Sequence, residues 1–531
     1  MEKIERNMSL TGEPPEAMST KQKIASAIGL SGLFILILAI ANVNFPHKAI
    51  FLSAAIGLIA VGTIMFANDA YLGKSAGVKN DGVWFKSFTS RGFWAWILAI
   101  GLTLFYIVLY WFPQYLGLNQ DAENTGIISL FDPLSRLISG NPASQWFVYG
   151  TLYTLAILVF GYKFILKYRH NKYEVLRTYS VMFFQLGFAF LIPEILIRLN
   201  QPYYNPANIW PLNYDLFASY KLEEFFSSGN IGLLMFIFGI LSIFVITPIL
   251  TFKYGKRWYC SWVCGCGGLA ETAGDPYRHL SDKSKFAWKV ERWVVHSVLV
   301  FVVVMTIAVV YSFLGNDSNA TWLTKDVFLW GSAGFLTLLF ALIMIFKRKE
   351  LAKDAKYGAI GYMAIILAIM GINYFSGNWN IFIFEGHQLR AWYGFLIGAA
   401  FSGVIGVGFY PIFGNRVWCR FGCPMAAILG MQQRLFSRFR ITTNGGQCIS
   451  CGNCSTYCEM GIDVKAYAQK GENIVRSSCV GCGICSAVCP RGVLKLENGS
   501  RDGRINSREV LLGNDVNLMD LLNQDAKGSV K

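Results

Sequence analysis

Two stretches near the end of the chain, CISCGNCSTYC (residues 448–458) and CVGCGICSAVC (residues 479–489), carry the same cysteine spacing. Each reads C-x2-C-x2-C-x3-C. Three thiolates on a tight loop hold one face of an iron–sulfur cubane, and the fourth cysteine of each run reaches across to the other cluster. The spacing therefore predicts the ligands of two [4Fe-4S] clusters and makes electron transfer the first hypothesis for function.

The pattern also predicts which thiols share a cluster. Glycines between the cysteines let the backbone bend around an inorganic core and point N–H groups at sulfur. A zinc module or a disulfide framework is the alternative, but zinc sites come as two well-separated C-x2-C pairs. Glu459 follows the fourth cysteine of the first run, where proline would be usual. We expect an α+β domain of the bacterial 2[4Fe-4S] ferredoxin type over residues 444–496, with Cys448, Cys451, Cys454 and Cys489 binding cluster 1 and Cys479, Cys482, Cys485 and Cys458 binding cluster 2.

The composition indicates a membrane protein with a small soluble part. The 531 residues are 54% hydrophobic, 15% aromatic and only 15% charged. The first apolar run is too long for the apolar core of a signal peptide, so we expect a retained helix. Ten runs are long enough to cross about 30 Å of hydrocarbon, at approximately residues 24–45, 49–67, 93–112, 146–166, 179–198, 229–252, 293–314, 327–346, 357–376 and 392–413.

The distribution of lysine and arginine predicts the sidedness of these helices. Every second connecting segment carries a single Lys or Arg, the segments between them carry at least four, and the tail from residue 414 is the richest. Because cytoplasmic loops retain positive charge, both termini are predicted to be cytoplasmic. The net charge of +15 then faces anionic lipid headgroups. The charges form no basic recognition element, so nucleic-acid binding is not expected.

Four further cysteines lie in two matching segments, GKRWYCSWVC (residues 255–264) and GNRVWCRFGC (residues 414–423). Glycine, arginine, an aromatic residue and both cysteines recur at the same offsets, which indicates a repeat. An even number of helices per unit keeps both units in one orientation, with the relating axis along the membrane normal. The predicted organisation is a cytoplasmic segment 1–23, two additional helices with their loop in 24–92, four-helix units 93–266 and 267–430 that each end in C-x3-C, the ferredoxin domain, and a polar cytoplasmic tail 497–531.

The repeated cysteines are candidate ligands of a third centre. Residues four apart on a helical turn share a face, so two such faces meeting across the pseudo-axis supply four thiolates. The hypothesis is a third iron–sulfur cluster or another metal centre at the cytoplasmic membrane boundary, formed by Cys260, Cys264, Cys419 and Cys423. The alternative is four buried structural cysteines, or redox thiols without metal. Cys266 stays unassigned, since it could replace a ligand or serve as a small apolar side chain.

A polytopic domain with two cytoplasmic C-x3-C motifs, followed by a two-cluster ferredoxin, resembles the membrane-bound polyferredoxins. These include the membrane subunit of periplasmic nitrate reductase systems and the C-terminal part of the nitrous-oxide reductase regulator. The similarity covers roughly helices three to ten and the ferredoxin, and its most specific residues are Arg257, Arg416, Pro424 and the twelve motif cysteines. It implies quinone-linked electron transfer that supports a respiratory or maturation enzyme, in a bacterial inner (cytoplasmic) membrane. The first copy departs from the family pattern, with Gly265 at the position of Pro424.

All identifiable redox ligands fall on the cytoplasmic side. Of five histidines, only His296 lies in a predicted helix, so no bis-histidine haem pair is available. His296, preceded by Glu291 and Arg292, is a candidate for quinone protonation, or else an interfacial residue with a satisfied hydrogen bond. A short amphipathic stretch in the tail, around residues 510–522, is expected to dock a partner or to cover the ferredoxin.

The leading hypothesis for function is a membrane-bound iron–sulfur protein that passes electrons between cytoplasmic-side [4Fe-4S] clusters and the quinone pool or a partner redox enzyme. It would act as an electron carrier or as a subunit of a quinone-linked oxidoreductase. One alternative is a copper reductase or assembly factor for a respiratory oxidase, since soft thiolates select Cu(I). Another is a redox-sensing transporter, which the scarcity of buried charge in the helices disfavours.

Overall fold

The computed structural model describes residues 18–73, 86–119, 123–315, 323–377, 380–381, 384–499, 511–512 and 516–517. Most of the predicted N-terminal segment 1–23 lies outside this range. Of the predicted tail beyond residue 499, the structure describes only β5 (Leu511–Leu512) and β6 (Val516–Asn517), which pair antiparallel. The amphipathic stretch predicted around 510–522 lies mostly outside the described residues.

Nine helices in the described part of the chain are long and apolar enough to cross a membrane. Each coincides with one of the predicted spans, and most ends agree within a few residues. The helix predicted to begin at 293 instead begins at Lys285, because the Ser284 side chain caps it by accepting the N–H of Ala287. The nine are α1 (Thr20–Ile40), α2 (Lys48–Tyr71), α4 (Phe93–Trp111), α6 (Gln145–Lys167), the continuous α7 (Lys172–Phe183), η3 (Phe184–Leu191) and α8 (Ile192–Arg198), the continuous α10 (Gly229–Leu241), η4 (Ser242–Ile246) and α11 (Thr247–Tyr254), α14 (Lys285–Leu314), α15 (Lys325–Phe346) and α16 (Lys353–Ser376).

The tenth predicted span, 392–413, is interrupted. It consists of the end of α17 (Gly386–Tyr393), the π-helical segment η7 (Gly394–Ile405), a turn, and α18 (Tyr410–Phe413). Glycine is a poor helix former, and here it also permits close approach to α4. A Cβ at Gly403 would lie 2.6 Å from Cε2 of Tyr110, and one at Gly408 would lie 2.5 Å from Oγ1 of Thr103. Gly403 and Gly408 therefore pack tightly against α4, whereas Gly394 and Gly398 pack against Tyr214.

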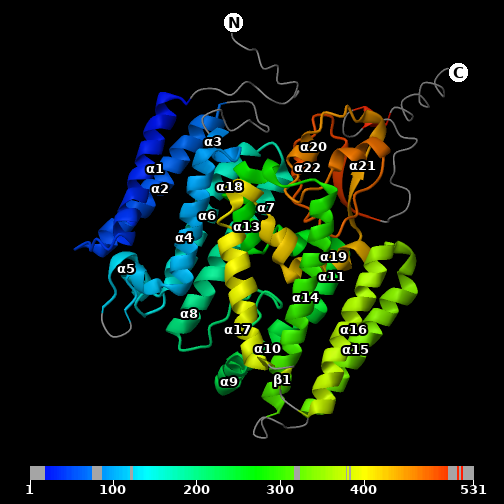
Figure 1. Cartoon of the computed structure of the whole chain (residues 1–531). Coiled ribbons are helices and arrows are strands. Elements are labelled where there is room, and N and C mark those ends of the chain that lie inside the picture. Colours follow the sequence, from blue (N-terminus) through cyan, green and yellow to red (C-terminus); the bar gives the residue numbers. More distant parts are fainter. Residues whose placement is uncertain are drawn as a thin grey trace, which may run out of the picture.

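The long helices run roughly alongside one another, and the cysteine-rich domain lies at one end of them (Figure 1). α1 and α2 form a hairpin at one edge that packs against α5 (Gly126–Ile138) and α6, and α15 and α16 form a second hairpin at the other edge. α9 (Ser219–Ser227) and the two-residue strands β1 (Asn380–Ile381) and β2 (Phe384–Glu385) lie at the far end. Other short elements outside the cysteine segments are α3 (Lys86–Thr89), η2 (Pro113–Leu116) and η6 (Arg348–Glu350).

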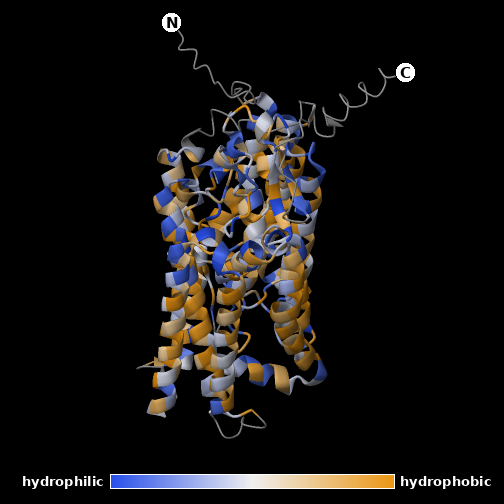
Figure 2. Ribbon diagram, turned by 90° about the vertical axis from the view of Figure 1, so that its right-hand side faces the viewer, coloured by the Kyte–Doolittle hydropathy of each residue, from blue (hydrophilic) through white to orange (hydrophobic). Residues whose placement is uncertain are grey.

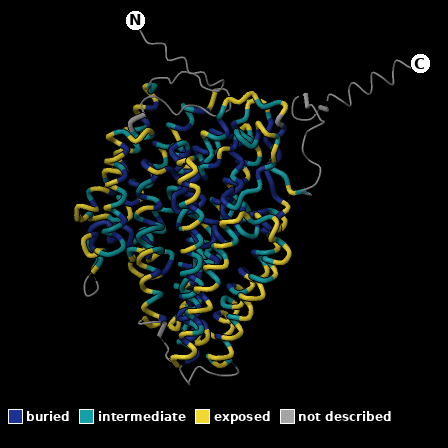
Figure 3. The backbone as a smooth tube through the Cα atoms, turned by 45° about the vertical axis from the view of Figure 1, so that its right-hand side comes forward, coloured by how far each residue is buried: buried dark blue, intermediate teal, exposed yellow. Residues whose placement is uncertain are grey.

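The surface of the long helices is apolar, as a lipid-facing surface requires. Figure 2 shows hydrophobic residues along most of their length, with polar residues gathered toward the end that carries the cysteine-rich domain. Figure 3 shows exposed residues down the outer faces of the helices and buried residues concentrated nearer the cysteine-rich end. Large apolar side chains such as Leu234 (66% exposed), Ile345 (71%) and Phe375 (85%) lie on these outer faces. The arrangement fits a multi-pass membrane protein.

The C-terminal domain combines short helices with a two-stranded antiparallel sheet, so the α+β class predicted for it is consistent with the structure. β3 (Phe439–Thr443) pairs with β4 (Leu494–Asn498) in the register Phe439↔Asn498. Between these strands lie η9 (Gly445–Gln447), α20 (Asn453–Thr456), α21 (Val464–Lys470) and α22 (Ile484–Ala487). One buried core runs continuously from this domain into the C-x3-C segments.

Candidate metal centres

The four cysteines predicted for cluster 1 line a single cavity with about 360 Å³ of empty space. Cys448, Cys451 and Cys454 come from the first run, and Cys489 comes from the end of the second. The N–H of Val493 donates to Cys489 Sγ at 3.4 Å. Burial and the neighbouring Cys489 thiol raise the pKa of Cys454 to about 12. A cavity lined by four thiols fits a cubane, which takes one thiolate on each iron.

The cysteines predicted for cluster 2 also gather in one place. Burial raises the pKa of Cys485, and the next contributions come from Cys479 and Cys458. Burial likewise raises the pKa of Cys479 to about 11, with Cys458 again adding to it. Cys458 therefore lies near Cys479 and Cys485 of the second run. Cys482 belongs to the same group. Burial raises its pKa most, Glu459 raises it next, and Cys485 adds a smaller increase.

Glycines shape both cysteine loops in the same way. Gly452 (φ +83°) and Gly483 (φ +93°) each precede a one-turn helix, α20 or α22, that carries the third cysteine of its run. A side chain is strained at such angles, whereas glycine adopts them freely. The repeated cysteine spacing in the sequence therefore corresponds to a repeated backbone conformation in the structure.

Glu459, the residue that replaces the usual proline, anchors the ferredoxin domain to the rest of the chain. Its carboxylate is buried and accepts from Arg278 Nη1 at 2.7 Å and from Asn415 Nδ2 at 3.1 Å, and it lies 3.0 Å from Arg416 Nε. Burial opposes its ionisation, but Arg416 and Arg278 hold the pKa of this carboxyl below its usual value. The departure from the ferredoxin pattern therefore has a tertiary reason, since Glu459 joins the end of the first cysteine run to the second C-x3-C segment.

A buried network of charges surrounds this contact, and the sequence analysis did not find it. Arg416 also pairs with Glu271, and Lys167 Nζ lies 2.7 Å from Asp275 Oδ2. Two of its pairs have i,i+3 spacing within one helical turn, which was a local signal of pairing. The members are four cations and four carboxylates: Lys167, Arg177, Arg278, Arg416, Glu174, Glu271, Asp275 and Glu459.

The two C-x3-C segments share a local conformation. Each begins with a glycine of positive φ, Gly255 (φ +69°) and Gly414 (φ +96°), and continues into a short helical element, α12 (Arg257–Cys260) or η8 (Trp418–Gly422). The second cysteine of each is the N-cap residue of the next helix, α13 (Gly265–Thr272) or α19 (Pro424–Leu435). The expectation that both cysteines of a motif share one helical turn is therefore corrected, since each pair spans a helix end and the start of the next helix.

The second cysteines occupy matching helix N-cap positions. Cys423 Sγ accepts the N–H of Ala426 at 3.4 Å. Helix N-termini favour negative charge, so both positions suit a thiolate. Cys266 is now explained as well. Its thiol hydrogen-bonds to Cys264, and this bond is the largest of the contributions that lower the pKa of Cys264 to about 7.

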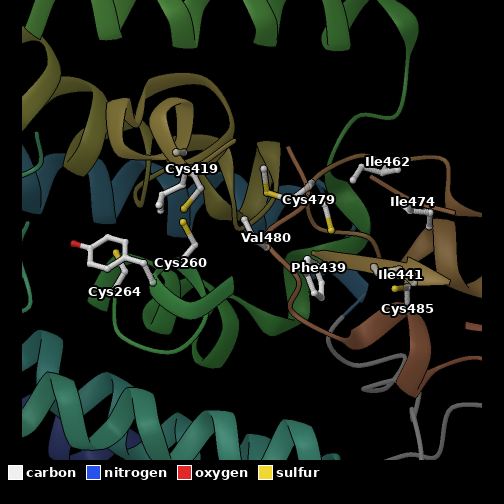
Figure 4. Close-up of a cluster of buried hydrophobic side chains, with 14 of the residues drawn as sticks. Cys260, Cys264, Cys419, Phe439, Ile441, Ile462, Ile474, Cys479, Val480 and Cys485 are labelled. Carbon is white, nitrogen blue, oxygen red and sulfur yellow. The ribbon is translucent and has the colours of Figure 1, made fainter. Parts of the chain in front are cut away.

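The four C-x3-C cysteines belong to one buried core cluster. In Figure 4 the thiols of Cys260 and Cys419 point toward each other. Burial raises the pKa of Cys423, and Cys419, Cys260 and Cys264 all add to it. Arg416 Nη1 donates to the Cys260 carbonyl at 3.3 Å and lies 3.5 Å from Cys419 Sγ. Among the described residues, no three His, Cys, Asp or Glu side chains converge closely enough to hold a single metal ion.

Glycines 265, 267 and 268 explain why the first motif lacks the proline of the second. α13 starts directly against its neighbours, so a Cβ at Gly265 would overlap the Gln185 side chain and one at Gly268 would overlap Val181. A Cβ at Gly267 would overlap the carbonyl oxygen of Cys260 and lie 3.0 Å from Arg416 Nη1. There is no room here for the ring that Pro424 places at the corresponding position.

We expect Gly267→Ala to lower stability by about 1–3 kcal/mol, because overpacking forces the backbone of Cys260 to move. The midpoint of thermal unfolding in detergent and the iron content of the purified protein would both fall. Gly101→Ala is the matched control, because a Cβ at Gly101 meets nothing within 4 Å. Equal effects of the two substitutions would contradict this account of the contact.

His296 lines a second cavity, with about 320 Å³ of empty space, between α14 and the cysteine segments. The cavity is also lined by Lys256, Cys419 and Ser477. His296 Nδ1 lies 2.5 Å from the carbonyl oxygen of Arg292, the hydrogen bond expected for an interfacial residue. Glu291 is not free to assist it, because its carboxylate accepts from Arg420 Nε at 2.7 Å.

Comparisons with known proteins agree with this geometry. Residues 440–490 match a family model described as a 4Fe-4S dicluster domain, and residues 236–286 and 395–442 each match one described as a 4Fe-4S binding domain. A segment of 58 residues is 38% identical to the putative electron transport protein YccM of Escherichia coli (strain K12). That segment covers 11% of this chain and only 16% of the relative. No solved structure matches the chain. The chain carries [4Fe-4S] clusters in a ferredoxin-type domain, joined to many long apolar helices.

Proposed function

We propose that this protein passes electrons between the quinone pool, or a partner redox enzyme in the membrane, and clusters on the cytoplasmic side of a bacterial inner membrane. One observation carries the proposal. Ser261, directly after Cys260, donates its hydroxyl to the carbonyl of Val480, directly after Cys479, at 2.9 Å. A C-x3-C cysteine and a cluster 2 cysteine are thus joined by backbone and a single hydrogen bond.

The four C-x3-C cysteines hold a third [4Fe-4S] cluster in this proposal. Three observations support it: both motifs fall inside matches to a 4Fe-4S binding domain, the thiols of Cys260 and Cys419 point toward each other (Figure 4), and Arg416 places a buried positive charge 3.5 Å from Cys419 Sγ. A third cluster would supply one-electron transfer at the boundary between the helices and the ferredoxin.

The ligand sets are ordered from the helices to the surface. Cys479 and Cys485 of cluster 2 and Cys454 of cluster 1 are buried, whereas Cys451 of cluster 1 is exposed. Ile449 beside it is also exposed, at 43%. Cluster 1 is therefore the terminal that a soluble donor or acceptor would reach, and the C-x3-C centre is the terminal nearest the membrane.

The proposed topology has ten crossings, two pseudo-repeated four-helix units and cytoplasmic termini. The alternation of positive charge between loops supports the sidedness. The matched conformations at Gly255 and Gly414, and at the two N-cap cysteines, support the repeat. The ferredoxin domain and both C-x3-C segments then lie together in the cytoplasm.

A quinol-driven reduction assay tests this function. Purified protein, oxidised and in detergent, is mixed with a short-tailed quinol, and cluster reduction is followed by EPR. We expect the clusters to be reduced in the wild-type protein and reduced at least tenfold more slowly in Cys260→Ala, which removes a ligand at the membrane-side terminal. If quinol does not reduce the clusters but Cu(II) oxidises them, the protein would instead be identified as a copper reductase of the oxidase-assembly type.

A further inference from the structure

Lys256 occupies an unusual position between two groups of cysteines. It is the middle residue of the first G-x-R motif, where the second copy has Asn415. Its side chain is only 2% exposed, and its Nζ has one hydrogen bond, to the carbonyl of Ser477 at 3.3 Å. Its backbone N–H is fixed by Gln433 Oε1 at 2.7 Å. In the described part of the chain no carboxylate forms an ion pair with it.

Lys256 lies against segments of both ligand sets. Its carbonyl oxygen accepts the N–H of Cys260 at 3.1 Å. Gln433, which accepts the N–H of Lys256, donates to the carbonyl of Cys479 at 2.8 Å. Ser477, which accepts its hydrogen bond, lies two residues before Cys479, and Cys419 lines the same cavity as Lys256.

The carboxylates of the surrounding segments are already paired with other cations and do not neutralise this lysine. Glu291 pairs with Arg420, and both Glu271 and Glu459 pair with Arg416. A buried cation without an anionic partner costs several kcal/mol. A [4Fe-4S] core held by four thiolates carries net negative charge, and one-electron reduction adds to it, so net charge helps to set the reduction potential. A negatively charged cluster on each side of Lys256 would offset the free-energy cost of burying its ammonium group.

We propose that Lys256 is a positioning residue that supplies the counter-charge shared by cluster 2 and the C-x3-C centre, and that it favours the reduced state of both. The part concerning Cys260 and Cys419 rests on the proposed third cluster, whereas the part concerning Cys479 rests on the ferredoxin alone. Position 256 lies between two ligand sets, and the other repeat has asparagine at the corresponding position. Asn415 instead donates to the carbonyl of Ala270 and to Glu459.

Redox titration followed by EPR tests this role on the purified full-length protein. Lys256→Gln and Lys256→Met remove the positive charge, whereas Lys256→Arg retains it. We expect a shift to more negative midpoint potential for the cluster on Cys479, and for the C-x3-C centre, in both neutral variants. The arginine variant should stay near wild type. Lys289→Met, at an exposed position of α14, is the matched control and should shift neither.

Iron analysis separates this proposal from the function on which it partly rests. Unshifted potentials in Lys256→Gln, in protein that keeps its full iron content, would overturn the role of Lys256 and leave the third cluster standing. An iron content equal to two clusters would rule out the third cluster. A shift of the Cys479 cluster to more negative midpoint potential would then still support Lys256 as its counter-charge. Equal shifts in the arginine and glutamine variants would mean that packing, not charge, sets the potential, and would also overturn the proposal.

Discussion

Cys260→Ala and Cys419→Ala are each expected to lose about a third of the iron of the purified protein, because each removes one of four ligands of the proposed third cluster. The two thiols come from different segments of the repeat, yet they face each other in the folded chain. Iron and acid-labile sulfide per protein, together with loss of one EPR signal, measure the effect. The signals of the two ferredoxin clusters should persist.

Cys266→Ala is the matched control for this experiment. Cys266 lies two residues from Cys264 and hydrogen-bonds to it, but it stands outside the repeated C-x3-C pattern. We expect this variant to keep its full iron content. Unchanged iron in both Cys260→Ala and Cys419→Ala would show that the four cysteines are structural or redox thiols without metal.

Glu459→Ala is expected to destabilise the attachment of the ferredoxin domain by about 3–5 kcal/mol. The substitution leaves the guanidinium groups of Arg278 and Arg416 buried with one partner fewer each, and an uncompensated buried charge is far more costly than a lost surface pair. Glu459→Gln, which keeps hydrogen-bonding capacity without the charge, should have a smaller effect. The midpoint of thermal unfolding in detergent and the rate of cluster loss on warming measure the change.

Glu472→Gln provides the comparison, because Glu472 belongs to the same domain but is exposed. It should behave like wild type. A Glu459→Ala protein as stable as Glu472→Gln would mean that the buried network is held by its remaining pairs, and that Glu459 does not anchor the domain.

Local patterns were sufficient for the features that depend on a few neighbouring residues. The two cysteine runs predicted two loops of one kind, because each run carries its own glycine and its own one-turn helix. The assignment of the eight thiols to two clusters stays a prediction. The apolar runs predicted nine long helices because crossing hydrocarbon requires a minimum length of apolar sequence. The tenth was harder to predict, since its glycines serve tertiary contacts, those with α4 among them, that apolar length does not show.

The sequence by itself determined that this protein carries [4Fe-4S] clusters on a ferredoxin domain and many long apolar helices, because ligand spacing and apolar length are local properties of the chain. The tertiary structure alone decided what lies between those parts. Glu459 became an anchor, and Lys256 became a charge between two ligand sets. Each role arises where segments far apart in sequence bury charged or polar groups together, and burial without a partner costs too much free energy for such pairings to be accidental.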